Sequence, residues 1–340
     1  MKKIFLLCVA LLVTVGSMSA QPAGTQRRSM NTIRKVELKD ISMSDPYILA
    51  DPQTKMYYMT GTGGRLWKSA DLKTWEGPYA VAETDPTSWM GERPAIWAAE
   101  IHYYEGKYYF FGTFTNDNII IEDIPNRYKI PRRASHVLVA DKAEGPYRPM
   151  SNEPYTDEKL ATLDGTLWVE NGTPYMIYCH EWLQCVDGTM DMIKLTKDLS
   201  ASKGKAKTMF KASEGPWSRE MNYLGELTYG LPLGGQVTDG PFLFKTQTGK
   251  LGMLWSSWSE KRYTQGVAYS ASGKLRGPWI HEQEPLNTGN QGHGMMFRTF
   301  EGKLLMCLHY QDEGAPRKPR LMEVDDSGDK IRIIGEYIPR

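Results

Sequence analysis

A pattern of short hydrophobic strands recurs five times along this chain of 340 residues. Each repeat opens with a polar or acidic residue, continues as an apolar strand, turns at a motif such as Glu105-Gly106-Lys107, and returns as an aromatic strand. The openings are Asp45-Pro46-Tyr47-Ile48, Glu100-Ile101-His102-Tyr103, Asp164-Gly165-Thr166-Leu167, Asp239-Gly240-Pro241-Phe242 and His293-Gly294-Met295-Met296. Repeats of this length fit a four-stranded unit with a loop, the building block of a β-propeller. We therefore predict an all-β fold, a five-bladed β-propeller with four antiparallel strands per blade.

A second repeat supports this fold. Four of the openings are followed by a further strand, a tight polar turn and an outer strand that begins at an aromatic residue. The segments are 69–75, 140–147, 195–199 and 269–279. Turns of this composition occur in any β protein, but their recurrence in step with the first repeat favours a propeller over a β-sandwich.

The first 20 residues have the pattern of a secretory signal peptide. Lys2 and Lys3 precede an apolar run from Ile4 to Val15, and small residues follow up to Ala20. The run is too short for a stable membrane-spanning helix, and no other stretch is apolar enough to enter a bilayer. We expect an exported protein, periplasmic or extracellular, with a signal peptide at 1–20, a flexible leader at 21–35 and one propeller domain at 36–340.

The composition narrows the class of partner. The 41 basic and 40 acidic residues are interspersed, a balance that does not favour a nucleic-acid or anionic-membrane partner. Three cysteines follow the signal peptide, an odd number that cannot form a complete disulfide framework. The 10 tryptophans and 19 tyrosines are more telling, because aromatic rings in an exported, near-neutral β protein suit stacking on sugars. We expect a monomer with a carbohydrate substrate.

The propeller fold brings two sets of residues to one mouth of the central channel. The inner strand of each blade starts near that mouth, and the antiparallel second strand ends there. The five openings therefore meet the second-strand ends, which are Gly61-Thr62, Thr113-Phe114, His180-Glu181-Trp182, Ser256-Ser257-Trp258 and His309-Tyr310. Gathering several carboxylates and histidines is costly unless they serve a function, so this mouth is the predicted site.

The openings resemble those of glycoside hydrolase family 43. The resemblance rests on five short motifs in the family's order over about residues 41–310: Asp45-Pro46, Ile96-Trp97-Ala98-Ala99-Glu100, Asp164-Gly165, a carboxylate before Gly240-Pro241, and Gly292-His293-Gly294. It implies a secreted, inverting, exo-acting glycosidase of polysaccharides or oligosaccharides. The implied targets are α-L-arabinofuranosides, β-D-xylosides or β-D-galactofuranosides. An alternative is a non-catalytic carbohydrate-binding propeller.

An inverting glycosidase needs a carboxylate base, which activates water, and a carboxylic acid, which protonates the leaving oxygen. The resemblance implies that Asp45 is the base, and that Asp164 raises the pKa of the acid and orients it. The bland alternatives are a turn Asp before proline for Asp45 and an ordinary Asp-Gly turn for Asp164.

The acid is the position where the chain departs from the family. The family usually has Glu-Gly-Pro where this chain has Asp239-Gly240-Pro241, and aspartate is shorter by one methylene, roughly 1 to 1.5 Å. We therefore weigh two candidates, Asp239 itself and Glu181, which lies between His180 and Trp182. We favour Glu181 as the acid, with Asp239 as a supporting carboxylate. The alternative for Glu181 is a strand-end glutamate paired with an arginine.

Other candidates at the mouth would bind substrate or a metal ion. His293 resembles the family's channel histidine, which implies a structural calcium ion in the central channel and no organic cofactor. The expected substrate-binding residues are Trp97, Phe114, His180, Trp182, Trp258 and His309. For the tryptophans, the competing interpretation is burial within the blades.

Overall fold

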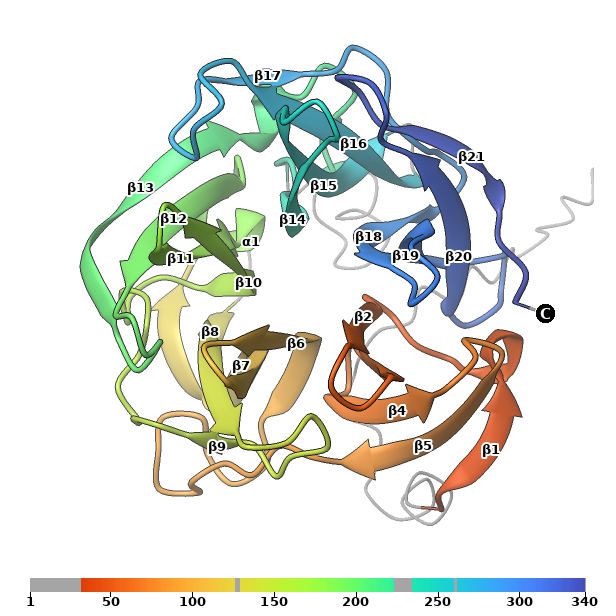
Figure 1. The fold of residues 1–340 in the computed structure, drawn as a ribbon. Coiled ribbons are helices and arrows are strands. Elements are labelled where there is room, and N and C mark those ends of the chain that lie inside the picture. The colour runs from red at the N-terminus through yellow and green to blue at the C-terminus, as the bar shows by residue number, and fades with distance from the viewer. Residues whose placement is uncertain (1–31, 126–128, 223–233, 260–261, 340) are drawn as a thin grey trace, which may run out of the picture.

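Five antiparallel sheets stand around a central axis and form a five-bladed β-propeller, which confirms the predicted fold (Figure 1). The structure is a computed structural model that describes residues 32–125, 129–222, 234–259 and 262–339. The predicted signal peptide and most of the predicted leader lie outside these ranges. No helix in the ranges described is long and apolar enough to cross a membrane.

Each blade is built from consecutive strands; the first strand is innermost in blades two to five, and β2 is innermost in blade one (Figure 1). Blade one contains β1 (Arg34–Glu37), β2 (Tyr47–Asp51), β3 (Met56–Thr60), β4 (Arg65–Ser69) and β5 (Thr74–Ala80). Blade two contains β6 (Ala95–Tyr104), β7 (Lys107–Asp123), β8 (Lys129–Ala140) and β9 (Arg148–Pro149). Blade three contains β10 (Thr162–Glu170), β11 (Thr173–His180), β12 (Thr189–Leu195) and β13 (Ser202–Lys211). Blade four contains β14 (Asp239–Lys245), β15 (Leu251–Ser259), β16 (Arg262–Ser270) and β17 (Trp279–His281). Blade five contains β18 (Gln291–Arg298), β19 (Leu304–Tyr310), β20 (Lys318–Asp325) and β21 (Arg332–Glu336).

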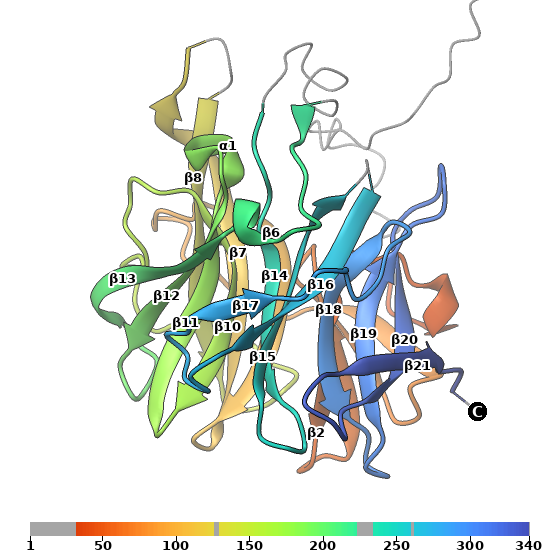
Figure 2. The ribbon, with the colours of Figure 1, turned by 90° about the horizontal axis from the view of Figure 1, so that it is seen from above.

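Blade one departs from the predicted four strands, because β1 is added outside β5 as a fifth, outermost strand. Residues 34 and 35, which we assigned to the leader, belong to this strand. The 3-10 turn η1 (Leu38–Asp40) then leads into blade one. The backbone N–H of Met43 donates to the carbonyl of Arg317, 2.9 Å away, and this bond joins the first and last blades. Figure 2 shows the short helix α1 (Trp182–Cys185), which follows β11, at one end of the ring.

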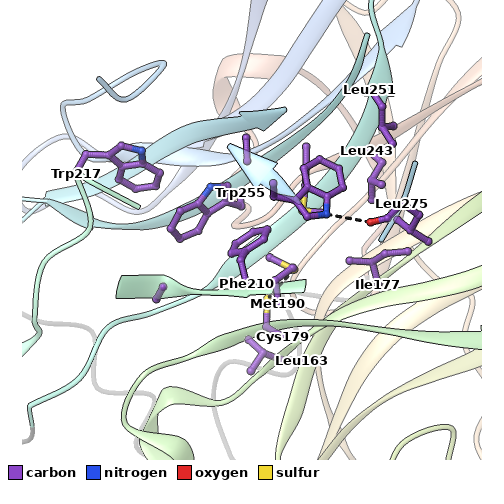
Figure 3. Packing of buried hydrophobic residues seen from close by; sticks show 14 residues of the cluster. Leu163, Ile177, Cys179, Met190, Phe210, Trp217, Leu243, Leu251, Trp255 and Leu275 are labelled. Carbon is purple, nitrogen blue, oxygen red and sulfur yellow. Dashed lines mark hydrogen bonds between the residues drawn. The ribbon is translucent and has the colours of Figure 1, made fainter. Parts of the chain in front are cut away.

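A separate hydrophobic cluster fills each of the five joints between neighbouring blades. The cluster between blades three and four contains Trp255, whose ring contacts those of Phe210 and Trp217 in tilted arrangements, together with Cys179 and Met190 (Figure 3). Each large side chain buried in this way contributes about 1.5 to 3 kcal/mol to folding. Because the sheets bury both faces, the inner strands are held at fixed positions around the channel.

One residue in each blade, at the start of the inner strand, has a left-handed backbone conformation. These residues are Asp45 (φ 57°), Ala98 (φ 41°), Asp164 (φ 56°), Gly240 (φ 53°) and His293 (φ 50°). In blades two to five the residue begins a bulge, where the pairing with the second strand skips two residues. A bulge re-aims the side chains at its position, and these five residues are therefore structurally equivalent.

Two of the predicted openings, Glu100 and Asp239, do not lie at this equivalent position. Glu100 lies two residues after its blade's left-handed residue, Ala98, and Asp239 lies one residue before Gly240. The carboxylate of Glu100 accordingly has a different partner and lies 2.7 Å from Nε2 of His102. Only blades one, three and five place a polar side chain at the equivalent position.

Candidate active site

Asp45 is held by side chains from two blades, His293 and His309 of blade five and Thr62 of blade one. Its Oδ1 lies 3.2 Å from Nδ1 of His293 and 3.1 Å from Nδ1 of His309, and its Oδ2 accepts a hydrogen bond of 2.5 Å from Oγ1 of Thr62. Burial by itself raises the pKa of Asp45, but the charges of His293 and Arg317 outweigh it. The pKa is therefore held well below its usual value, and the carboxylate is ionised at neutral pH.

His309 holds the backbone of Asp45 in place. The backbone N–H of Asp45 donates to Nδ1 of His309 over 3.1 Å, and the imidazole is fully buried. Burial lowers the pKa of His309 to about 4, against the opposing effect of Asp45, so the ring is neutral at neutral pH. The ring of Tyr263 stacks on it, with centroids 5.1 Å apart. A fully buried ring does not fit the predicted contact with a sugar, and His309 instead fixes the position of Asp45.

Asp164 lies on the other side of His293. Its Oδ2 is 3.8 Å from Nδ1 of His293 and accepts a hydrogen bond of 3.0 Å from the backbone N–H of Gly240. Its own N–H donates to Oγ1 of Thr113, 2.8 Å away. Burial raises the pKa of Asp164 well above its usual value, and the negative charge of Asp45 raises it further, while the Gly240 N–H opposes both.

Asp239 begins β14 and completes the group. Burial raises its pKa well above the usual value, and the charge of Asp164 adds to the effect, against an opposing contribution from His293. Its Oδ2 is hydrogen-bonded to the hydroxyl of Tyr263 over 3.1 Å. Burial also raises the pKa of Tyr263 well above its usual value, so the phenol keeps its proton.

The three aspartates therefore form one electrostatically coupled group around His293. Asp45 is held ionised, whereas Asp164 and Asp239 both hold protons more strongly than an ordinary aspartate. Environments that drive the pKa values of neighbouring carboxyl groups apart in this way are typical of a general base and a general acid. Because such groups titrate together, the proton affinity belongs to the group and not to one residue.

Glu181 is engaged in a buried ion pair. It lies between β11 and α1 with a side chain only 6% exposed, and its Oε2 accepts a hydrogen bond from NH1 of Arg133 in β8. The guanidinium also donates from Nε to Thr115, 3.1 Å away, and its carbon lies 4.0 Å from the ring centroid of Trp97. This is the arginine-paired arrangement that we set out as the alternative for Glu181.

Removing Arg133 should destabilise the protein. The change Arg133→Ala leaves the carboxylate of Glu181 buried without its partner, and breaking a buried ion pair from one side costs about 3 kcal/mol or more. Urea unfolding followed by tryptophan fluorescence measures this loss. The double variant Arg133→Met with Glu181→Met is the control and should recover most of the stability. Equal stability of Arg133→Ala and wild type would show that the pair contributes nothing.

The predicted sugar-binding residues lie in different environments. Trp97, Trp182 and Trp258 are each partly exposed, as a stacking platform requires. The ring of His180 is partly exposed and hydrogen-bonded through Nε2 to Oε1 of Gln184, 3.0 Å away. Phe114 does not fit, because it is fully buried in the cluster between blades one and two.

Two site residues came from positions that the sequence analysis did not consider. Tyr263 lies in a third strand, β16, whereas we expected the mouth to be lined by first and second strands. Arg317 precedes β20, and its guanidinium carbon lies 5.3 Å from the ring centroid of Tyr263. The repeat alone could have pointed to the third strands, since they neighbour the second-strand ends.

The calcium ion that we expect in the central channel stays a prediction. Calcium takes six to eight oxygen ligands, and water can supply some of them. Among the residues that the structure describes, no group of three or more His, Cys, Asp or Glu side chains could hold a metal ion. The Nδ1 atom of His293 faces Asp45 and Asp164.

Comparison with known proteins adds three findings. The family model of glycosyl hydrolases family 43 matches residues 39–327. The crystal structure of an endo-arabinase from Bacteroides thetaiotaomicron VPI-5482 is 33% identical, with a TM-score of 0.73, and the match covers 85% of this chain and 96% of that one. No curated protein sequence matches.

More distant solved structures share the fold. An endo-1,4-β-xylanase from the same Bacteroides strain is 24% identical, with a TM-score of 0.64 and coverage of 89% of this chain and 97% of that one. An α-L-arabinofuranosidase from Lactobacillus brevis is 16% identical, with a TM-score of 0.60 and coverage of 89% and 99%. At these identities the likeness extends to the fold alone.

Proposed function

Because this chain belongs to glycosyl hydrolases family 43 and is a glycoside hydrolase, we propose that it hydrolyses α-L-arabinofuranosyl linkages with inversion. The observation that carries this proposal is the coupled group of Asp45, Asp164 and Asp239 around His293. One member is held ionised and the other two hold protons more strongly than an ordinary aspartate, as an acid and base pair requires.

Asp45 is the general base of the proposed reaction. Its ionised carboxylate takes a proton from a water molecule as that water attacks the anomeric carbon. The hydrogen bond from Thr62 and the two histidines fix the direction of the carboxylate. A base held by three partners loses little orientational freedom when the substrate binds, which lowers the barrier to attack.

Asp239 is the general acid. Its protonated carboxyl delivers a proton to the leaving oxygen, so the departing alcohol need not leave as an alkoxide. The contact between Arg133 and Glu181 weighs against the acid role that we favoured for Glu181, because the guanidinium occupies the carboxylate oxygen Oε2. Asp164 is the third carboxylate, and in its ionised form it raises the pKa of Asp239.

The arabinase at 33% identity supports arabinofuranosyl linkages as the first substrates to examine. The β-D-xylosides and β-D-galactofuranosides expected from the sequence are the competing substrates. The sequence pattern also predicts that single sugar residues are released, whereas the arabinase is described as endo-acting. We further propose that residues 1–20 direct export, so that the enzyme meets polysaccharide outside the cytoplasm.

Hydrolysis of matched p-nitrophenyl glycosides tests the proposed function. We expect the highest kcat/KM on the α-L-arabinofuranoside, with lower values on the β-D-xyloside and the β-D-galactofuranoside. Linear arabinan distinguishes the mode of action, because exo cleavage releases only arabinose at first and endo cleavage releases oligosaccharides. Binding of arabino-oligosaccharides without any product would contradict catalysis and would favour the non-catalytic carbohydrate-binding propeller.

A further inference from the structure

The inner-strand residues with a left-handed backbone conformation form similar hydrogen bonds through their backbone N–H groups. In four of the five joints, the N–H donates to a side chain at the second-strand end of the preceding blade. The pairs are Asp45 with His309 (3.1 Å), Ala98 with Thr62 (3.0 Å), Asp164 with Thr113 (2.8 Å) and His293 with Ser256 (2.9 Å). These bonds satisfy buried donors that would otherwise be costly.

The joint between blades three and four is the exception. The backbone N–H of Gly240 donates to Oδ2 of Asp164, a residue of the inner strand, over 3.0 Å. Gly240 can come this close because it has no side chain. A Cβ atom there would lie 2.7 Å from the imidazole of His293, and the residue has a φ of 53°.

The strand register identifies what is different at this joint. Within blades two, four and five, the residue before the left-handed one pairs with the second-strand acceptor, as in Trp97 with Thr113, Asp239 with Ser256 and Gly292 with His309. In blade three the same register pairs Leu163 with Cys179. Cys179 therefore occupies the position at which the other blades provide an oxygen or nitrogen acceptor.

The thiol of Cys179 does not provide an equivalent acceptor. It is fully buried, its sulfur lies 4.0 Å from the sulfur of Met190, and Figure 3 shows it among the apolar side chains of the cluster between blades three and four. Sulfur is a weak acceptor compared with a hydroxyl oxygen or an imidazole nitrogen. The N–H of Gly240 is thus left to the carboxylate of Asp164.

We propose that Cys179 is a positioning residue for the hydrolysis: by offering Gly240 no good acceptor, it leaves that N–H to Asp164 and fixes this carboxylate between blades three and four. The inference rests on the proposed function, in which Asp164 acts on the neighbouring acid Asp239. Asp164 then has two partners that set its direction, the Gly240 N–H and His293. A second-strand oxygen at position 179 would compete for the first of them.

Three substitutions of Cys179 test the inference. Cys179→Ser adds a hydroxyl oxygen with little change of shape, and we expect kcat on arabino-oligosaccharides to fall by about tenfold with KM unchanged. Cys179→Ala and Cys179→Val add no acceptor and should keep kcat within about twofold of wild type. A wild-type kcat in Cys179→Ser, or an equal loss in all three variants, would overturn the positioning role.

An NMR readout that needs no activity separates this inference from the proposed function. Labelling with ¹³C-carbonyl aspartate and ¹⁵N-glycine selects the amides of Asp-Gly pairs, which are Gly165, Gly188 and Gly240. In Cys179→Ser we expect the Gly240 amide to shift while Gly188, bonded to the carbonyl of Gln236, stays in place. Asp164→Asn should shift the Gly240 amide in the same experiment. If Gly240 responds to Asp164→Asn but not to Cys179→Ser, the inference fails whatever the enzyme hydrolyses.

Discussion

Replacing Asp45 by asparagine should lower kcat on an aryl arabinofuranoside by about a thousandfold, because an amide cannot take the proton from the attacking water. Asparagine has nearly the same shape, so Thr62 and His309 keep a partner at this position. Steady-state kinetics measures the loss, and circular dichroism with thermal melting establishes that the propeller is intact.

The matched control is Asp40→Asn. Asp40 is an exposed aspartate in η1, outside the coupled group, and its amide variant should keep full activity. Activity of Asp45→Asn above about a tenth of wild type would exclude Asp45 as the general base, since a base typically contributes 10² to 10⁴ in rate.

Replacing Asp239 by asparagine should have an effect that depends on the leaving group. A dinitrophenolate departs without a proton, so hydrolysis of the dinitrophenyl glycoside should fall only a few fold. A sugar or alkyl leaving group needs the proton, and we expect kcat on arabino-oligosaccharides to fall by about a hundredfold to ten-thousandfold. The ratio of the two losses is the diagnostic quantity, measured by parallel kinetics on both substrates.

Glu181→Gln is the decisive comparison for Asp239→Asn. Glutamine retains an oxygen that can accept the hydrogen bond from Arg133, so we expect any loss of kcat to be similar for good and poor leaving groups. If the leaving-group dependence appears in Glu181→Gln and is missing from Asp239→Asn, the acid is Glu181 and the Asp239 assignment is wrong.

The five-bladed fold could be predicted because the repeat is long and regular, and because each blade uses the same strand and turn chemistry. For blades two and four, the sequence could not show with the same accuracy which residue lies at the equivalent, left-handed position. The inner strands contain two-residue bulges, and the equivalent positions there are Ala98 and Gly240, which carry no polar side chain to mark them. The sequence pattern therefore indicates a nearby polar residue instead, Glu100 in blade two and Asp239 in blade four.

Errors at single residues have a similar origin. Successive side chains of a strand point to opposite faces, so a prediction that is wrong by one residue places a side chain in the channel when it lies in the core. Thr113 bonds to Asp164 in the site, and its neighbour Phe114 is consequently buried between blades. The pairing of Glu181 with Arg133 joins two blades, and no local pattern specifies such a contact between residues 48 positions apart.

The configuration of the first sugar released tests the central claim most directly. Inversion follows from a base and an acid that act on opposite sides of the sugar, whereas a nucleophilic carboxylate would give retention. Proton NMR during the early hydrolysis of p-nitrophenyl α-L-arabinofuranoside distinguishes the two before mutarotation mixes the anomers. We predict that β-L-arabinofuranose accumulates first. Initial accumulation of the α-anomer would contradict the roles assigned to Asp45 and Asp239.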